Sequence, residues 1–421
     1  MNIKSSPKYK ILIFAPAFAP MNNPEAVVNG KLALAFLKQG WEVDIISNSN
    51  KSDYEYTQDI EDLWSPLNHC TYSIQPPVLN KLFRYIDTLK CFIKTGHPVE
   101  GCRWAYSAYK QALLLIEVKK YDFILSRAMS DNAHLPAMLL SRKTGISWIA
   151  NWNDPHTEKA PHPWEETKPF SFIKNRYNKA ILNQIKWHTF PSEKMRIYMS
   201  DYLSNSLLDK SSVFPHIGLD YKITQKQDSR HFTICYSGAL YQGRDPSTLF
   251  SAVSDLILES VEIKSFVKIV LLGEFTSWIY ELIKNYNLED YVIIEQPKSY
   301  LESLDFISKM DLLFILETNY TDGIFLPSKM VDYYQVNRPI LAMGPSNSEV
   351  QSIINKHCGG IYISHSESDD FKGKLFDLFQ LWKDKGIDGY VINSTLSQIF
   401  DPQVIIKKYE NLFDTIIMSK K

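Results

Sequence analysis

The sequence has little of what marks several protein classes. Lys plus Arg number 46 and Asp plus Glu 47, so the formal net charge is -1 and no global field draws the chain to nucleic acid. Five scattered cysteines form no close pair of the kind that a zinc site or a redox motif needs, so we expect no metal site, and ordinary thiols in a reducing compartment. No apolar run reaches the roughly 18 to 20 residues that span a bilayer, and the first ten residues are polar, unlike a signal peptide. We expect a cytoplasmic protein, with peripheral contact at the inner face of a membrane left open.

Apolar strands alternate with helical periodicity along the chain. Residues 10–14 predict a buried strand, the apolar positions of 28–36 predict a helix that Gly40 ends, and 41–47 predict a second strand. A strand, helix and strand in succession form a parallel crossover unit. The alternation returns at 122–150 and again at 231–364. Because 421 residues exceed what one core usually supports, the sequence predicts two Rossmann-like, doubly wound α/β domains.

The domain boundaries follow from breaks in this alternation. The polar segment 224–230 predicts a linker between a first domain, 1–223, and a second, 231–400, with a final helical segment at 401–421. Residues 79–120 interrupt the first domain with aromatic side chains mixed with Lys and Arg. This insertion either docks on an anionic membrane or forms an ordinary amphipathic cap over the sheet.

Two strand-to-helix loops of the second domain have the chemistry of an anion site. Gly238 permits close backbone approach, and Arg244 offers a forked donor to phosphate. Further along, Ser328 and Lys329 begin a helix whose N–H groups favour a diphosphate, and Asp332 can accept from ribose hydroxyls. The structural alternative is an N-cap serine with a solvated Lys–Asp pair.

The segment 327–342 resembles that of family 4 glycosyltransferases with the GT-B fold. It reads Pro327-Ser328-Lys329-Met330-Val331-Asp332-Tyr333-Tyr334, and then Arg338-Pro339-Ile340-Leu341-Ala342. Stretches at 15–43, 148–155, 190–195 and 236–240 agree in order and spacing, so the resemblance spans nearly the whole chain. It implies two Rossmann-like domains facing a central cleft, a final helix returning to the first, and metal-independent transfer of a sugar from a nucleoside diphosphate sugar with retention.

The resemblance also implies site residues. The donor-binding set is Gly238, Arg244, Gln296, Pro297, Asp322, Ser328, Lys329 and Asp332. The catalytic candidates are Asp154, His156 and Glu317, and the acceptor-side candidates are Asn29, Arg127 and His134. Asp154 and His156 follow a predicted strand, where either could orient or deprotonate an acceptor hydroxyl, or simply form a surface turn.

Two positions depart from the family pattern. Ile324 stands where the family often has the first of two glutamates, so Glu317 or Asp322 would substitute for it. Ala239 stands where many relatives have an arginine, which leaves more of the phosphate binding to Arg244. The departures put the sugar contacts in question.

The expected partners are a nucleotide sugar and a saccharide or lipid-linked acceptor, in bacterial O-antigen, capsule or exopolysaccharide synthesis, with no nucleic acid and no cofactor. A UDP-N-acetylglucosamine 2-epimerase with the same fold and a catalytically silent partner of another transferase are the alternatives. A dehydrogenase is excluded because residues 16–24 contain no glycine for a dinucleotide fingerprint.

Overall fold

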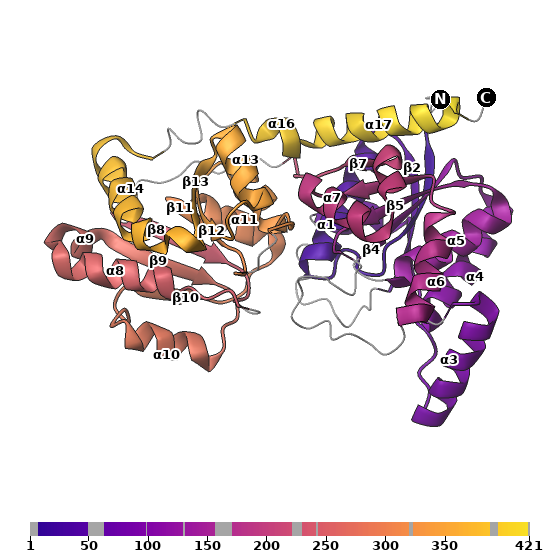
Figure 1. Cartoon of the computed structure of the whole chain (residues 1–421), viewed down its shortest axis with the longest axis horizontal. Helices are drawn as coiled ribbons and strands as arrows, with labels where there is room; N and C mark the ends of the chain where they lie inside the picture. Colours follow the sequence, from indigo (N-terminus) through magenta and orange to yellow (C-terminus); the bar gives the residue numbers. More distant parts are fainter. Residues whose placement is uncertain are drawn as a thin grey trace. The chain divides into compact units, whose positions relative to one another are not determined.

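The computed structural model describes residues 7–48, 63–97, 99–128, 131–155, 171–220, 230–240, 243–319, 323–387 and 395–419. The chain divides into two compact units, called unit 1 (residues 1–217 and 402–421) and unit 2 (residues 218–401) (Figure 1). Apart from Arg230, the predicted linker 224–230 lies outside the described residues.

Unit 1 is built on a seven-stranded parallel sheet with the strand order β3-β2-β1-β4-β5-β6-β7. Its strands are β1 (Lys10–Phe14), β2 (Glu42–Ser47), β3 (Thr71–Ser73), β4 (Phe123–Ala128), β5 (Ser147–Trp152), β6 (Trp187–Phe190) and β7 (Ser211–Val213). Its helices are α1 (Pro24–Lys38), α3 (Lys81–Thr95), α4 (Cys102–Val118), α5 (Asp131–Thr144), α6 (Ser171–Leu182), α7 (Glu193–Leu203) and α17 (Pro402–Met418), with 3-10 turns η3 (Ser65–Leu67) and η4 (Asn205–Lys210).

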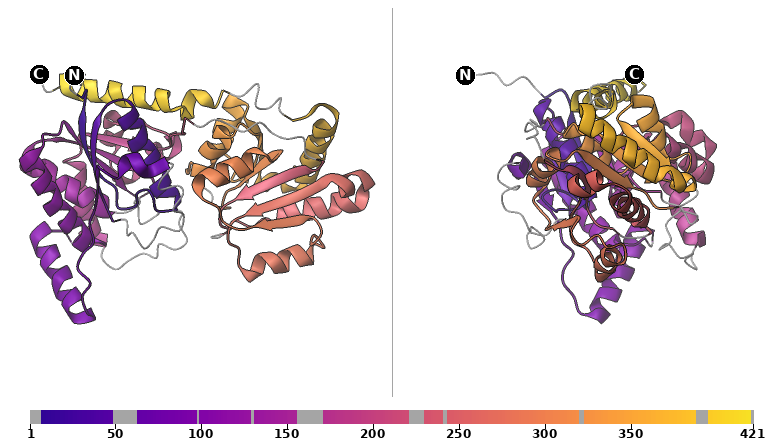
Figure 2. Two further views of the ribbon diagram at one scale, coloured as in Figure 1. Left: turned by 180° about the vertical axis from the view of Figure 1, so that it is seen from behind. Right: turned by 90° about the vertical axis from the view of Figure 1, so that its left-hand side faces the viewer.

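The last helix, α17, packs on unit 1, although the chain reaches it only after passing through unit 2 (Figures 1 and 2). The buried ring of Phe413 stacks on Phe123 at 4.3 Å between centroids and meets Tyr9 edge-on at 5.1 Å. The Tyr9 hydroxyl donates to Asp414 at 2.5 Å. The predicted return of the final helix to the first domain is confirmed.

Unit 2 has a six-stranded parallel sheet with the strand order β10-β9-β8-β11-β12-β13. Its strands are β8 (Phe232–Ser237), β9 (Val267–Leu272), β10 (Val292–Glu295), β11 (Leu312–Leu316), β12 (Ile340–Gly344) and β13 (Gly360–Ser364). Its helices are α8 (Ser247–Glu259), α9 (Val261–Phe266), α10 (Ser277–Asn285), α11 (Tyr300–Ser308), α12 (Ser328–Gln335), α13 (Glu349–His357), α14 (Phe371–Lys385) and α16 (Ser397–Phe400), with the 3-10 turn η5 (His365–Asp370).

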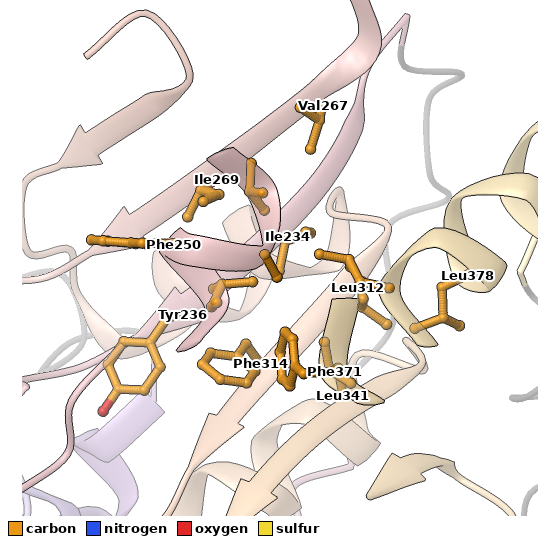
Figure 3. Close-up of a cluster of buried hydrophobic side chains, with 14 of the residues drawn as sticks. Ile234, Tyr236, Phe250, Val267, Ile269, Leu312, Phe314, Leu341, Phe371 and Leu378 are labelled. Atoms are coloured by element: carbon orange, nitrogen blue, oxygen red, sulfur yellow. The ribbon is translucent and has the colours of Figure 1, made fainter. Parts of the chain in front are cut away.

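Alternate residues of the unit 2 strands fill one hydrophobic core. Ile234, Ile269 and Phe314 face the same side of the sheet and meet Phe250 of α8 and Phe371 of α14 (Figure 3). Both faces of a parallel sheet must be covered, which is why these strands are apolar at nearly every position. The predicted fold class, two doubly wound α/β domains, is confirmed.

The insertion at 79–120 forms two helices with different environments. α4 buries Trp104, Ala105, Ala108, Ala112 and Leu115, as a cap over the sheet would. α3 buries only Cys91 and Thr95. No helix in the described ranges has the length and apolar character needed to cross a membrane.

Candidate functional site

In each sheet the strand order reverses at one place, the topological switch point. In unit 2 this place lies between the neighbouring strands β8 and β11, and the loops that follow these two strands begin there side by side. In unit 1 the corresponding neighbours are β1 and β4. Open α/β sheets bind ligands in the crevice outside the carboxyl ends of such strands. Most of the predicted residues of both units follow these strands.

The first cation of the unit 2 site is Lys329, which lies over the end of β8. Its Nζ is 3.8 Å from the centroid of the Tyr236 ring. A Cβ built on Gly238 would lie 3.5 Å from the same nitrogen. Gly238 has φ +110°, a conformation that L side chains rarely adopt, so its backbone is open to close approach there. The structure therefore brings Gly238 and Lys329 together, as predicted, and adds the π face of Tyr236.

Two tyrosine hydroxyls hold the elements around this lysine. The buried Tyr333 of α12 accepts a hydrogen bond from the Ser237 N–H at 3.1 Å and donates to the Phe314 carbonyl at 3.3 Å. It thereby fixes the first turns of α12 to both β8 and β11. Tyr236 donates to the Ala239 carbonyl at 3.0 Å, which fixes the loop after Gly238.

The N-terminus of α12 adds partial positive charge beside Lys329. Pro327 occupies the N-cap and its side chain has no atom that can accept a hydrogen bond, so Ser328 is the first helical residue and not the cap. Ser328 therefore does not act as the N-cap, which was the structural alternative for this residue. Unpaired N–H groups and the helix dipole favour an anion at such an end.

Glu317 follows β11 and is almost completely buried. The Tyr362 hydroxyl donates to its Oε2 at 3.0 Å, and a Cβ on Gly344 would lie only 2.5 Å from that oxygen. Burial raises the pKa of this carboxyl to about 7, against the opposing effects of hydrogen bonds from Ser348 and Tyr362 and of the positive charge of Arg244. Below that pH the Glu317 carboxyl is mostly protonated and neutral, so it would not repel an anion bound nearby.

Arg244 lies close enough to Glu317 and Tyr236 for its charge to act on both. Burial raises the pKa of the Tyr236 phenol to about 12, and the charge of Arg244 opposes this rise. Arg244 and Lys329 thus supply two cations to one edge of the sheet. Both were predicted as diphosphate ligands.

Asp332, predicted to bind ribose, lies on α12 in a small polar network. Its Oδ1 accepts from the Tyr300 hydroxyl at 2.6 Å and from Gln335 Nε2 at 3.2 Å. Gln335 also accepts from the N–H of Leu219. The network fixes the Asp332 carboxylate in one orientation, and its contact with a ribose stays a prediction.

The other donor candidates are distributed along the same edge. Gln296 and Pro297 follow β10, two strands from β8, and the Gln296 side chain is exposed. Their contact with a base stays a prediction. Asp322 lies outside the described residues, whereas Ile324, at the place of the family glutamate, is buried.

In unit 1 the structure joins two predicted acceptor residues. The Arg127 Nε, at the end of β4, donates to Asn29 Oδ1 at 2.7 Å. Asn29 Nδ2 donates to the Ala17 carbonyl at 2.8 Å and to Glu25 Oε1 at 3.0 Å, and Asn153 Nδ2 donates to the same carboxylate at 2.5 and 2.6 Å. Burial raises the pKa of Glu25, although Arg127, Asn29 and Asn153 lower it in part.

This unit 1 network, formed by Glu25, Asn29, Arg127 and Asn153, lies at the switch point between β1 and β4. Among the described residues Asn153 Oδ1 is buried and has no hydrogen-bond partner. Buried acceptors without a hydrogen-bond partner are rare in folded proteins, and a hydroxyl of a bound ligand would donate to this one. Glu25 and Asn153 were not among the predicted residues.

The remaining unit 1 candidates have different environments. His134 is buried on α5, where its Nδ1 meets Ser126 Oγ at 2.8 Å and its ring lies 4.3 Å from that of Trp152. This is a core environment, so its predicted contact with an acceptor has no support from its position. Asp154 is half-buried and follows β5 directly, as predicted, and His156 lies outside the described residues.

Sequence reasoning missed the residues that act through aromatic or amide side chains. Tyr236, Tyr333 and Tyr300 lie in apolar segments and are typical of core positions. Only their place at the carboxyl end of a strand, or on the helix that follows, distinguishes them. Glu25 carried a clearer signal, since Pro24-Glu25 begins the helix after β1.

Known structures with this fold include enzymes that act on nucleotide sugars. The structure of HepE from Anabaena in complex with UDP and glucose matches over 96% of this chain and 99% of that chain, at 12% identity and a TM-score of 0.63. Sucrose-phosphate synthase from Thermosynechococcus elongatus matches over 98% and 100%, at 12% identity and a TM-score of 0.67. A UDP-N-acetylglucosamine 2-epimerase matches over 99% and 98%, at 12% identity and a TM-score of 0.59.

No protein-family model and no curated protein sequence matches the chain. Identities near 12% establish the fold and not the reaction, because one fold serves many functions. The chain therefore has the GT-B fold over nearly its whole length, and its activity has to be argued from the site.

Proposed function

We propose that this chain is a glycosyltransferase that moves a sugar from a nucleoside diphosphate sugar to a saccharide or lipid-linked saccharide acceptor. One observation carries the proposal: Lys329 and the N-terminus of α12 lie beside the open backbone of Gly238 at the switch point of unit 2, and Arg244 follows β8 in the same loop. A diphosphate is the ligand that two cations and a helix N-terminus fit best.

These groups would also promote the chemistry. Cleavage of the bond between the sugar and the diphosphate leaves negative charge on the phosphate oxygens. Lys329 is already held over Tyr236, so it needs no reorganisation to stabilise that charge. A neutral Glu317 beside Arg244 adds no opposing negative charge below about pH 7.

The finer parts of the proposal rest on the family resemblance. They are UDP as the nucleotide, retention at the anomeric carbon, transfer without a metal ion, and a place in bacterial O-antigen, capsule or exopolysaccharide synthesis at the inner face of the membrane. On the acceptor side we propose Asp154, His156, Asn29 and Arg127, with His134 the least favoured because it is buried.

The first test is a calorimetric binding screen of UDP, GDP, ADP, CMP and their common sugar conjugates. Replacement of Lys329 or Arg244 by Ala should weaken binding of one nucleoside diphosphate by about ten- to a hundredfold, the usual worth of a charged hydrogen bond. Lys309→Ala removes a lysine that pairs with Asp305 on α11, away from the site, and should leave affinity unchanged. Equal affinities in wild type and both site variants would refute the donor site.

A second assay separates the reaction classes. The bound sugar nucleotide is incubated with candidate acceptors, with and without EDTA, and the products are separated by mass spectrometry. A new glycoside formed equally in EDTA supports a metal-independent transferase. A C2 epimer formed without acceptor would support the epimerase, which the fold also serves. Binding without any turnover would support the silent partner.

A further inference from the structure

Helix α3 presents an apolar face that the described part of unit 1 leaves exposed. Leu82, Ile86, Leu89 and Ile93 recur at helical spacing and are 66%, 41%, 59% and 74% exposed. At 100° per residue the four side chains form one stripe on the side opposite the buried Cys91. Figures 1 and 2 show α3 extending from the rest of its unit.

The opposite face of α3 is occupied by α4. The thiol of Cys102 lies 3.9 Å from the Thr88 carbonyl, and Asp87 forms an ion pair with Arg103 at 2.5 Å. Asp87 is the one acidic residue in α3, whose sequence is KLFRYIDTLKCFIKT. Its charge is therefore neutralised on the side that packs against the protein.

Within α3, the charged groups that flank the exposed stripe are basic. Lys90 borders it on one side and Lys81 on the other, and Phe83 and Tyr85 lie exposed beside it. Lys94 is turned toward α4, with its Nζ 5.1 Å from the centroid of the Tyr106 ring. Aliphatic side chains between cations, with aromatic rings at the margin, are the composition of helices that lie in the interface of an anionic bilayer. In a symmetric dimer formed through this stripe, basic margins would face basic margins, which disfavours a second copy as the occupant.

We propose that α3 docks unit 1 on anionic lipid, with Leu82, Ile86, Leu89 and Ile93 among the acyl chains and Lys81 and Lys90 at the headgroups. This surface rests on the proposed function in one respect, since it would hold the enzyme where a lipid-linked acceptor lies. The near-zero net charge of the chain makes a local basic surface of this kind necessary for any attraction to lipid.

The test is flotation of the full chain with vesicles of phosphatidylcholine alone or mixed with phosphatidylglycerol. Wild type should float only with the mixture, and salt should reduce its binding. Leu89→Ser with Ile93→Ser should lower the partition coefficient by about tenfold per side chain. Lys81→Gln with Lys90→Gln should lower it by about fivefold per charge. The control Leu258→Ser removes a similarly exposed leucine from unit 2 and should have no effect.

UDP affinity, measured on the same variants, keeps this proposal separate from the donor site. Loss of flotation with unchanged UDP affinity supports docking through α3. Equal flotation with neutral and mixed vesicles, or stripe variants that float like wild type, would overturn it. Sedimentation that shows a dimer abolished by the same variants would assign the stripe to a second copy instead.

Discussion

The buried carboxyl of Glu317 provides a quantitative test of the site. Burial raises its pKa from 4.5 to about 7, even though Ser348, Tyr362 and Arg244 act in the opposite direction. The folded protein therefore keeps a proton on this group over a range of pH in which the unfolded chain has lost it. Stability from this group is present at low pH and is lost as pH rises through about 7.

The size of the effect follows from the two pKa values. Each tenfold difference in acidity between the folded and unfolded states corresponds to about 1.4 kcal/mol. Between about pH 5.5 and about pH 8 the free energy of unfolding of unit 2 should fall by about 2 kcal/mol through Glu317 alone. Glu317→Gln keeps a neutral group of similar shape, so this part of the decline should be absent from the variant.

Hydrogen exchange at the amides of β11 measures this free energy within unit 2, after correction for intrinsic exchange rates. The difference between Glu317→Gln and wild type is the quantity of interest, because other titrating groups largely cancel from it. Glu295→Gln, which removes a half-exposed carboxylate paired with Lys298, gives the baseline. A difference that does not change between the two pH values would refute a buried Glu317 with a raised pKa.

Gly238→Ala should cost about 1–2 kcal/mol in thermal unfolding and weaken UDP binding in calorimetry, because φ +110° strains an L residue and the added methyl lies beside Lys329. Phe413→Ala should lower the free energy of unfolding of unit 1 by about 3–5 kcal/mol in urea titrations, since its fully buried ring joins α17 to Phe123. Glu25→Ala should destabilise unit 1 by about 1–3 kcal/mol in the same titrations, because two buried amides lose their acceptor, while UDP affinity stays unchanged.

Much of the fold could be predicted from the sequence because its elements are local and periodic. The strand predicted at 10–14 is β1 and the strand predicted at 41–47 is β2, each within a residue at its ends. The packed and exposed helices of 79–120 could not be told apart, since both show apolar residues at helical spacing. The difference depends on which face the neighbouring helix covers, and that is a tertiary property.

The donor residues could be predicted to the extent that their position on a strand end or helix start was decisive. These positions singled out Gly238, Arg244 and Lys329, whose role in donor binding stays a prediction. The contacts of Tyr236 and Tyr333 with these elements could not be predicted in this way. An aromatic residue in a strand or helix gives the same sequence pattern whether it fills the core or orients a cation. The pKa of Glu317 likewise depends on burial and on hydrogen bonds from Ser348 and Tyr362, which are distant in sequence.

The two switch points present different polar groups, and we propose on this ground a division of labour between the units. At the unit 2 edge, Lys329 and a helix N-terminus lie beside an open glycine and Arg244 follows in the same loop, which suits a diphosphate. At the unit 1 edge, the Glu25 carboxyl accepts from two amides, Arg127 donates to Asn29, and one buried amide oxygen has no partner among the described residues. Carboxylate and amide groups are poor ligands for an anion but good hydrogen-bond partners for the hydroxyls of a sugar. We therefore propose that unit 2 binds the nucleoside diphosphate and unit 1 the saccharide, as the proposed glycosyltransferase activity requires.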